Sequence, residues 1–192
     1  SLHRPPRLPA HAEGKYLLAP GAAQYAQSRP KFKADIVKKA LFLGYGYVAR
    51  CLTERLRACG WTVCGAVRSE AKADALEAEG VAPFLWAQEG LDPAAFESVD
   101  ALLISTPPGD DGCPAFAAAR AALVERARKF SWIGYLSSNG AYGDHGGEWI
   151  DENSALRATS PRAKNRIAAE ESWRALAAAA RSPLVVFRLP GI

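Results

Sequence analysis

Apolar runs and amphipathic segments alternate along the chain from about residue 38 onward. Short runs rich in Val, Leu, Ile, Phe and Ala predict strands, and apolar residues spaced three or four apart predict helices between them. The predicted strands span residues 39–43, 62–67, 82–86, 101–105, 132–137 and 184–189. The predicted helices span 47–58, 70–79, 93–97, 114–129 and 161–181, with Gly80 just past one helix end and Pro161 at one helix start.

Repeated strand–helix units of this kind predict an α/β fold. Strands that are apolar throughout are buried on both faces, so helices must cover both sides of the sheet through right-handed crossovers. We therefore expect a doubly wound, Rossmann-like parallel sheet with the strand order 3-2-1-4-5-6, numbered along the chain. Residues 38–192 form this domain. Residues 1–37 contain scattered prolines without sustained periodicity and are expected to be a basic, loosely ordered leader.

Composition narrows the class of protein. The net charge of +4 comes from the first 39 residues, which hold eight Lys or Arg and two acids, so the remainder carries −2 and shows no nucleic-acid footprint. No apolar run approaches the roughly 18 residues that span a bilayer. The four cysteines lack metal-site spacing, so we expect free buried thiols, no metal site and a cytoplasmic location.

A Gly-rich turn follows the first predicted strand and opens the first predicted helix. It reads Gly44, Tyr45, Gly46, Tyr47, Val48, Ala49, a G-x-G-x-x-A pattern. The first glycine permits a sharp turn, the second permits close approach of a pyrophosphate, and the small third residue lets the helix pack on the sheet. The free N–H groups of the helix start favour phosphate. This pattern predicts a dinucleotide site, with a tight turn that binds no ligand as the alternative.

Residues after two further strands extend this site. Arg68 and Ser69 stand where an acidic residue would bind the ribose hydroxyls of NAD, and an arginine suits a 2′-phosphate. The sequence therefore predicts NADP in preference to NAD, with a merely solvated Arg68 as the alternative. Ser105, Thr106 and Pro107 follow the fourth strand and are expected near the nicotinamide.

Motifs in the second half of the chain carry a resemblance to a known family. They are Tyr-Leu-Ser-Ser-x-x-Ala-Tyr-Gly-Asp at 135–144, Asp-Glu at 151–152, Ala-Ala-Glu-Glu at 168–171 and Phe-Arg-Leu-Pro-Gly-Ile at 187–192. Together they resemble the extended short-chain dehydrogenase/reductase superfamily, and within it the NAD-dependent epimerase/dehydratase group, across residues 39–192. The resemblance implies that Ser138 binds the reacting oxygen of the substrate. It also implies a smaller C-terminal substrate domain, which we expect to be absent from this chain.

The chain departs from the family pattern at the Tyr-x-x-x-Lys pair. One alignment puts Arg162 and Arg166 at these two places, and a shift of two residues gives Ser160 and Lys164. An arginine does not exchange protons near neutral pH, but Arg166 could hold a ribose or a phosphate. Tyr142 is the candidate substitute for the catalytic phenol, with packing of its ring as the alternative.

Two functions follow from these patterns. The first is an NAD(P)-dependent oxidoreductase or epimerase that acts on a small carbonyl or sugar-like substrate. The second is a non-catalytic NADP-binding sensor or scaffold. A small molecule is the expected partner, without nucleic acid or membrane, and a homodimer is left open.

Overall fold

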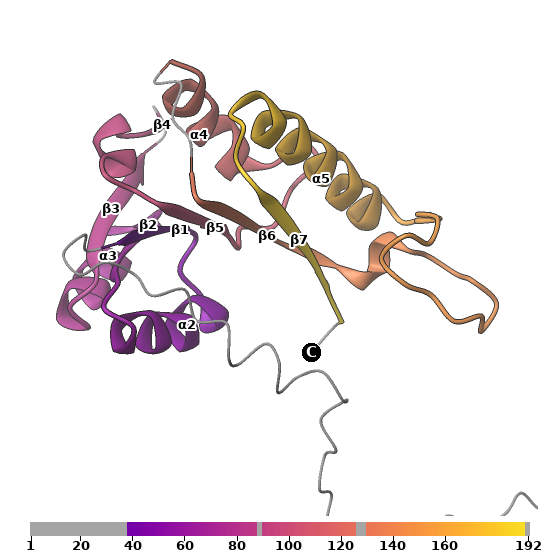
Figure 1. Cartoon of the computed structure of the whole chain (residues 1–192), viewed down its shortest axis with the longest axis horizontal. Coiled ribbons are helices and arrows are strands. Elements are labelled where there is room, and N and C mark those ends of the chain that lie inside the picture. The colour runs from indigo at the N-terminus through magenta and orange to yellow at the C-terminus, as the bar shows by residue number, and fades with distance from the viewer. Residues whose placement is uncertain (1–37, 88–89, 126–129, 191–192) are drawn as a thin grey trace, which may run out of the picture. The chain divides into compact units, whose positions relative to one another are not determined.

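The computed structural model describes residues 38–87, 90–125 and 130–190, and the expected leader lies outside this range. The core is a seven-stranded sheet with the order β4-β3-β2-β1-β5-β6-β7 (Figure 1). Its parallel strands are β1 (Lys39–Leu43), β2 (Thr62–Val67), β3 (Ala82–Ala87), β5 (Ala101–Ile104), β6 (Trp132–Ser138) and β7 (Leu184–Leu189). These six strands confirm the predicted order.

One strand was not predicted. β4 (Gly90–Leu91) pairs antiparallel with β3 and closes that edge of the sheet. It has only two residues, so it carries no period from which a strand could be predicted.

The helices also follow the predicted pattern. They are α2 (Tyr47–Ala58), α3 (Glu70–Ala78), α4 (Pro114–Glu125) and α5 (Pro161–Ala179), with short 3₁₀ helices η1 (Pro93–Phe96) and η2 (Asn139–Ala141). Pro161 lies in the first turn of α5, and the Ser160 hydroxyl caps that turn by accepting from the Ala163 N–H at 3.3 Å. Residues 126–129, predicted to end α4, lie outside the described range.

Helices lie on both faces of the sheet, as predicted for parallel strands (Figure 1). Successive residues of a strand point to opposite faces, and β1 feeds two cores in this way. Leu41 and Leu43 pack with α4 and α5, where Trp173 is fully buried. Ala40 and Phe42 pack on the other face with α2 and α3. This alternation fixes which residues can reach the ends of the strands.

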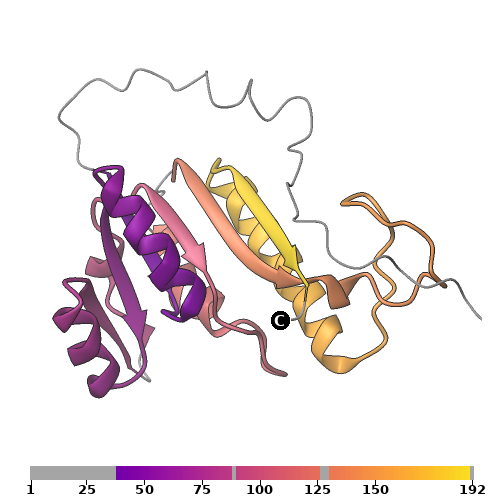
Figure 2. The same ribbon diagram turned by 90° about the horizontal axis from the view of Figure 1, so that it is seen from below.

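The second face is covered only in part. Figure 2 shows α5 behind β6 and β7, with no described helix in front of them. Val185, Phe187 and Leu189 of β7 point to that open side and are 37–39% exposed. A cavity of about 410 Å³ lies on the same face of the sheet, between α2 and Trp132, and the Trp132 ring contacts that of Phe187.

Two sequence expectations about the surface can be assessed. All four cysteines are free, and Cys64 and Cys113 are buried, whereas Cys51 on α2 and Cys59 just after its C-terminus are exposed. The expectation of buried thiols was therefore wrong for these two residues, because Cys51 falls on the solvent side of an amphipathic helix and Cys59 lies at its exposed end. Within the described residues, no helix is long and apolar enough to cross a membrane.

Candidate functional site

The predicted cofactor residues lie together at the carboxyl ends of neighbouring strands. Leu43, which ends β1, pairs with Ala66 of β2 on one side and with Ile104 of β5 on the other. Ile104 in turn pairs with Tyr135 of β6. The segments that follow these strands therefore emerge side by side, at the place where doubly wound sheets bind their ligands.

Gly44 makes the sharp turn out of β1. Its φ is +92°, in the left-handed region that glycine tolerates. Its carbonyl accepts a hydrogen bond from the Ser105 hydroxyl at 2.9 Å. A Cβ at this position would lie 2.9 Å from both the Ser105 Oγ and the Thr106 Cγ2, so something would have to shift. The turn is thus built against the end of β5 and requires glycine.

Gly46 differs from Gly44 in its surroundings. Its backbone is extended, and a Cβ added there would meet no described atom within 4 Å. α2 begins at the next residue, and no side chain caps its N-terminus. The first N–H groups of a helix have no partner inside the helix. An uncapped helix start therefore faces open space, with the positive end of its dipole outward.

The other residues of the turn divide between packing and exposure. Ala49 is fully buried, as close packing of α2 on the sheet requires, while Tyr47 is 79% exposed and Val48 is half-buried. The side chain of Tyr45 packs into the α2 side, where its hydroxyl donates to the Thr53 Oγ1 at 2.8 Å. Tyr45 can therefore offer a ligand only its backbone.

A second open helix start lies at the end of β2. Arg68 is exposed, and its guanidinium has no partner among the described residues. Ser69 is the N-cap residue of α3, yet its hydroxyl makes no capping hydrogen bond. A cationic residue therefore directly precedes an uncapped helix start, a combination that suits an anionic group.

The end of β5 contains an unpaired polar atom. The Thr106 Oγ1 is buried and has no hydrogen-bond partner within the described part of the chain. An unpaired buried hydroxyl costs about 1–3 kcal/mol, and a bound ligand could relieve this cost. Pro107 follows and is exposed. Asp110, further along this loop, accepts from the Asn165 side chain at 2.9 Å, which ties the loop to α5.

Ser138 ends β6 at the same edge of the sheet. It is half-buried, and its hydroxyl accepts from the Gly140 N–H at 3.2 Å as the N-cap of η2. The bond leaves the hydroxyl hydrogen free to be donated.

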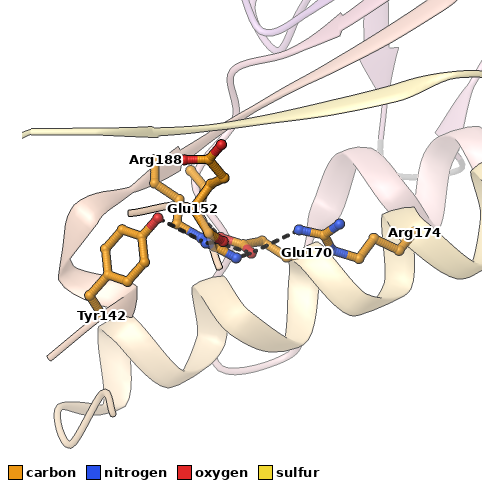
Figure 3. A network of polar contacts seen from close by, with 6 residues as sticks. Tyr142, Glu152, Glu170, Arg174 and Arg188 are labelled. Carbon is orange, nitrogen blue, oxygen red and sulfur yellow. Dashed lines mark hydrogen bonds and ion pairs between the residues drawn. The ribbon is translucent and has the colours of Figure 1, made fainter. Parts of the chain in front are cut away.

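Tyr142, the second predicted catalytic residue, lies beneath an arginine (Figure 3). It is 8% exposed, and the Arg188 guanidinium donates to its hydroxyl at 3.1 Å and lies 4.9 Å over its ring. This environment favours the packing alternative for the ring. The catalytic assignment of Tyr142 stays a prediction.

The residues at the Tyr-x-x-x-Lys places also have defined positions. The Arg166 Nη1 donates to the Leu136 carbonyl at 2.7 Å, so this side chain reaches from α5 to the end of β6. Arg162 and Lys164 are exposed. Burial, followed by the nearby Cys113, raises the pKa of Tyr135 to about 12, and the positive charge of Arg166 opposes this shift.

A buried ion pair next to this region was not predicted. The Glu170 side chain is 2% exposed, and its Oε2 forms an ion pair with the Arg188 Nη2 at 2.8 Å. The hydrogen bond to the Glu170 carboxylate raises the pKa of the Arg188 guanidinium, and this effect outweighs burial, which lowers it. Both residues stood in the motifs that carried the resemblance, but their pairing across 18 residues has no local signal. No cluster of three metal-binding side chains occurs among the described residues.

Comparisons with known proteins place the fold. No family model matches the chain, and no curated protein matches it. Among solved structures, a conserved protein of unknown function from Silicibacter pomeroyi is 39% identical, with a TM-score of 0.70, and the match covers 80% of this chain and 52% of that one. UDP-glucuronic acid 4-epimerase from Bacillus cereus, in complex with NAD, is 16% identical (TM-score 0.60; 79% of this chain, 56% of that one). A yeast methylglyoxal/isovaleraldehyde reductase complexed with NADPH is also 16% identical (TM-score 0.59; 77% and 56%).

These matches show which class of fold the chain adopts. Its sheet and helices are arranged as in that epimerase, that reductase and a short-chain dehydrogenase/reductase superfamily protein from Agrobacterium tumefaciens with bound NAD. The chain spans about half the length of the solved structures that it matches.

Proposed function

We propose that this chain is the NADP-binding part of an oxidoreductase or epimerase that acts on a small carbonyl or sugar-like substrate. The observation that carries the proposal is the uncapped start of α2 beside Gly46, where a Cβ would meet no described atom within 4 Å. A pyrophosphate needs this combination of open space and unpaired N–H groups. The similar folds of an NAD-bound epimerase and an NADPH-bound reductase support it.

The residues at the edge of the sheet fit such a cofactor. The backbone N–H groups from Gly46 to Val48 would hold the pyrophosphate, and Arg68 with Ser69 would hold a 2′-phosphate. The unpaired Thr106 hydroxyl would meet a polar group of the cofactor. These assignments favour NADP over NAD, because the exposed guanidinium of Arg68 gives a free ribose diol no acceptor.

The chemistry follows from what these residues can and cannot do. The nicotinamide of the cofactor, when bound, accepts or supplies a hydride. Ser138 would donate a hydrogen bond to the reacting oxygen and orient it. Arg166 would contribute positive charge without proton exchange, since a guanidinium stays protonated in proteins. Its bond to the Leu136 carbonyl also fixes it at the strand end that carries Ser138.

The experiment is a screen of carbonyl and sugar-like substrates with wild-type protein and Ser138→Ala. NADPH consumption reports an oxidoreductase, and product formation reports an epimerase, because an epimerase regenerates its cofactor. General acid/base and hydrogen-bonding groups typically contribute about 10²–10⁴-fold to a rate, so we expect Ser138→Ala to lose at least tenfold in turnover while still binding NADPH. Ser172→Ala is the matched control, because that exposed hydroxyl donates to the Ala168 carbonyl within α5. Equal turnover by Ser138→Ala and wild type would place the active site elsewhere.

The second candidate function is a non-catalytic NADP-binding module. The contact between Tyr142 and Arg188 favours it, because this contact engages the phenol that could otherwise replace the missing tyrosine. A protein that binds NADPH tightly but neither consumes it nor converts any substrate of the screen would support this alternative.

A further inference from the structure

A buried carboxylate links the strand that carries Ser138 to the loop that follows it. Glu170 of α5 is 1% exposed. Its Oε1 accepts from the Ser137 hydroxyl at 2.5 Å, and Ser137 directly precedes Ser138. The Arg188 Nε lies 3.2 Å from both carboxylate oxygens, and the Arg188 Nη2 lies 2.8 Å from Oε2. Figure 3 shows Glu170 between Arg188 and the more exposed Arg174.

The same arginine reaches the loop. The Arg188 Nη1 donates to the Tyr142 hydroxyl at 3.1 Å and lies 3.4 Å from the Glu152 carbonyl. The Tyr142 carbonyl accepts from the Arg157 N–H at 2.9 Å. Residues 139–157 therefore form a loop that is tied at its base, and the tie passes through Arg188 to Glu170. We call Ser137, Glu170 and Arg188 the clasp.

Stability alone gives a weak reason for such an arrangement. Taking two charges out of water is costly, and apolar residues of similar volume often stabilise a fold as well or better. What a satisfied buried pair does offer is fixed geometry, because each donor and acceptor has one arrangement that leaves nothing unpaired. Here the pair fixes three segments relative to one another. They are the end of β6 at Ser137, the end of β7 at Arg188 and the start of the loop at Tyr142.

We propose that Glu170 and Arg188 are positioning residues, which hold Ser138 and the loop 139–157 in place beside the nicotinamide. The role of Ser138 in this statement rests on the proposed function. The Glu170 side chain is too buried to contact a substrate, since it is 2% exposed. Arg188 is 12% exposed and borders a cavity of about 660 Å³, but its guanidinium is engaged with Glu170 and Tyr142. Glu170 and Arg188 act through Ser137 and Tyr142, which contact them directly.

The test compares wild type with the double variant Glu170→Gln/Arg188→Met and the control Glu171→Gln. A single substitution would leave an unpaired buried charge and could unfold the protein, so both charges are removed together. Glu171 is exposed and lies next to Glu170 in the sequence. Hydrogen exchange followed by mass spectrometry reports the loop, and the fluorescence of bound NADPH reports the surroundings of the nicotinamide.

We expect amides within 139–157 to exchange at least tenfold faster in the double variant, while β1 and β5 keep their protection. The dissociation constant for NADPH should stay within about threefold of wild type, because the pyrophosphate site lies on β1 and α2. The emission of bound NADPH should shift in the double variant and not in Glu171→Gln. A purely structural clasp would leave that emission unchanged.

Three results would overturn the proposal. The first is unchanged exchange in 139–157, and the second is unchanged emission of bound NADPH. The third is an equal rise in exchange throughout the sheet, which would mean that the pair only stabilises the domain. If wild-type protein binds no NADPH, the proposed function fails. The exchange measurement then still decides whether the clasp holds the loop.

Discussion

Gly46→Val separates cofactor binding from folding. Gly46 has an extended backbone that any residue adopts, and the added side chain would start in open space. The variant replaces an N-cap glycine with a poor capping residue, so we expect it to lose less than about 1 kcal/mol of folding free energy. The same side chain would fill the space over the start of α2 and exclude a pyrophosphate.

The loss of affinity can be estimated from the bonds removed. Hydrogen bonds to a charged group are worth about 1.5–3 kcal/mol each. If two backbone N–H groups lose the pyrophosphate, binding weakens by about 3–6 kcal/mol, or roughly 10²- to 10⁴-fold. NADPH titration by calorimetry measures this change, and urea unfolding measures the stability.

Gly44→Ala is the matched comparison, because here we expect the larger loss to be in folding stability. Its positive φ costs about 1–2 kcal/mol for an alanine, and displacement of Ser105 endangers a hydrogen bond worth about 1 kcal/mol. We therefore expect about 2–3 kcal/mol of lost stability for Gly44→Ala. A folded Gly46→Val variant that binds NADPH as tightly as wild type would refute the placement of the pyrophosphate.

Three further predictions concern single groups. Arg68→Ala should weaken NADPH binding about 10- to 150-fold, because one charge-assisted contact is lost, and should leave NADH binding unchanged. Arg55→Ala, on the exposed side of α2, is the control. An equal loss of affinity for both cofactors would contradict the assignment of Arg68 to the 2′-phosphate. Tyr135→Phe should raise the free energy of unfolding by about 1 kcal/mol, because the buried hydroxyl has no hydrogen-bond partner in the described structure. The pKa of Tyr135 is raised from 10.0 to about 12, so wild type should also lose stability as the pH rises from 10 to 12. Unfolding curves at alkaline pH would reveal this loss in wild type and its absence in the variant. Equal pH dependence of the two proteins would show that the phenol is solvated. Hydrogen bonds from the Asn153 N–H and from Ser154 lower the pKa of Asp151 below 3.8, so the turn that they form should loosen only as the pH falls through that lowered value. Ser154→Ala should move the titration of the Asp151 carboxyl, followed by NMR, back toward 3.8. An unmoved titration would contradict this.

Local signals explain how much of the fold could be predicted from the sequence. β1, α2, β2 and β7 begin and end at the predicted residues, because apolar periods and flanking glycines or prolines mark these ends within a few residues. The order of the strands followed from the doubly wound, Rossmann-like pattern that repeated strand–helix units indicate. β4 could not be predicted in this way, since two residues give no period.

The candidate site was predicted less completely, for a physical reason. The Gly-rich turn and Arg68 belong to single stretches of sequence, so their place at the strand ends followed from the fold. The surroundings of Tyr142 depend on Arg188, 46 residues away, and those of Ser137 depend on Glu170. Such contacts form between distant segments and leave no periodic trace in either one.

The central claim is that a nicotinamide dinucleotide lies across the carboxyl ends of β1, β2 and β5. A crystal structure of the chain with NADPH tests it most directly. The account predicts a pyrophosphate within hydrogen-bonding distance of the N–H groups at the start of α2, and a 2′-phosphate on Arg68. A dinucleotide bound elsewhere, or no binding at millimolar NADPH, would contradict it.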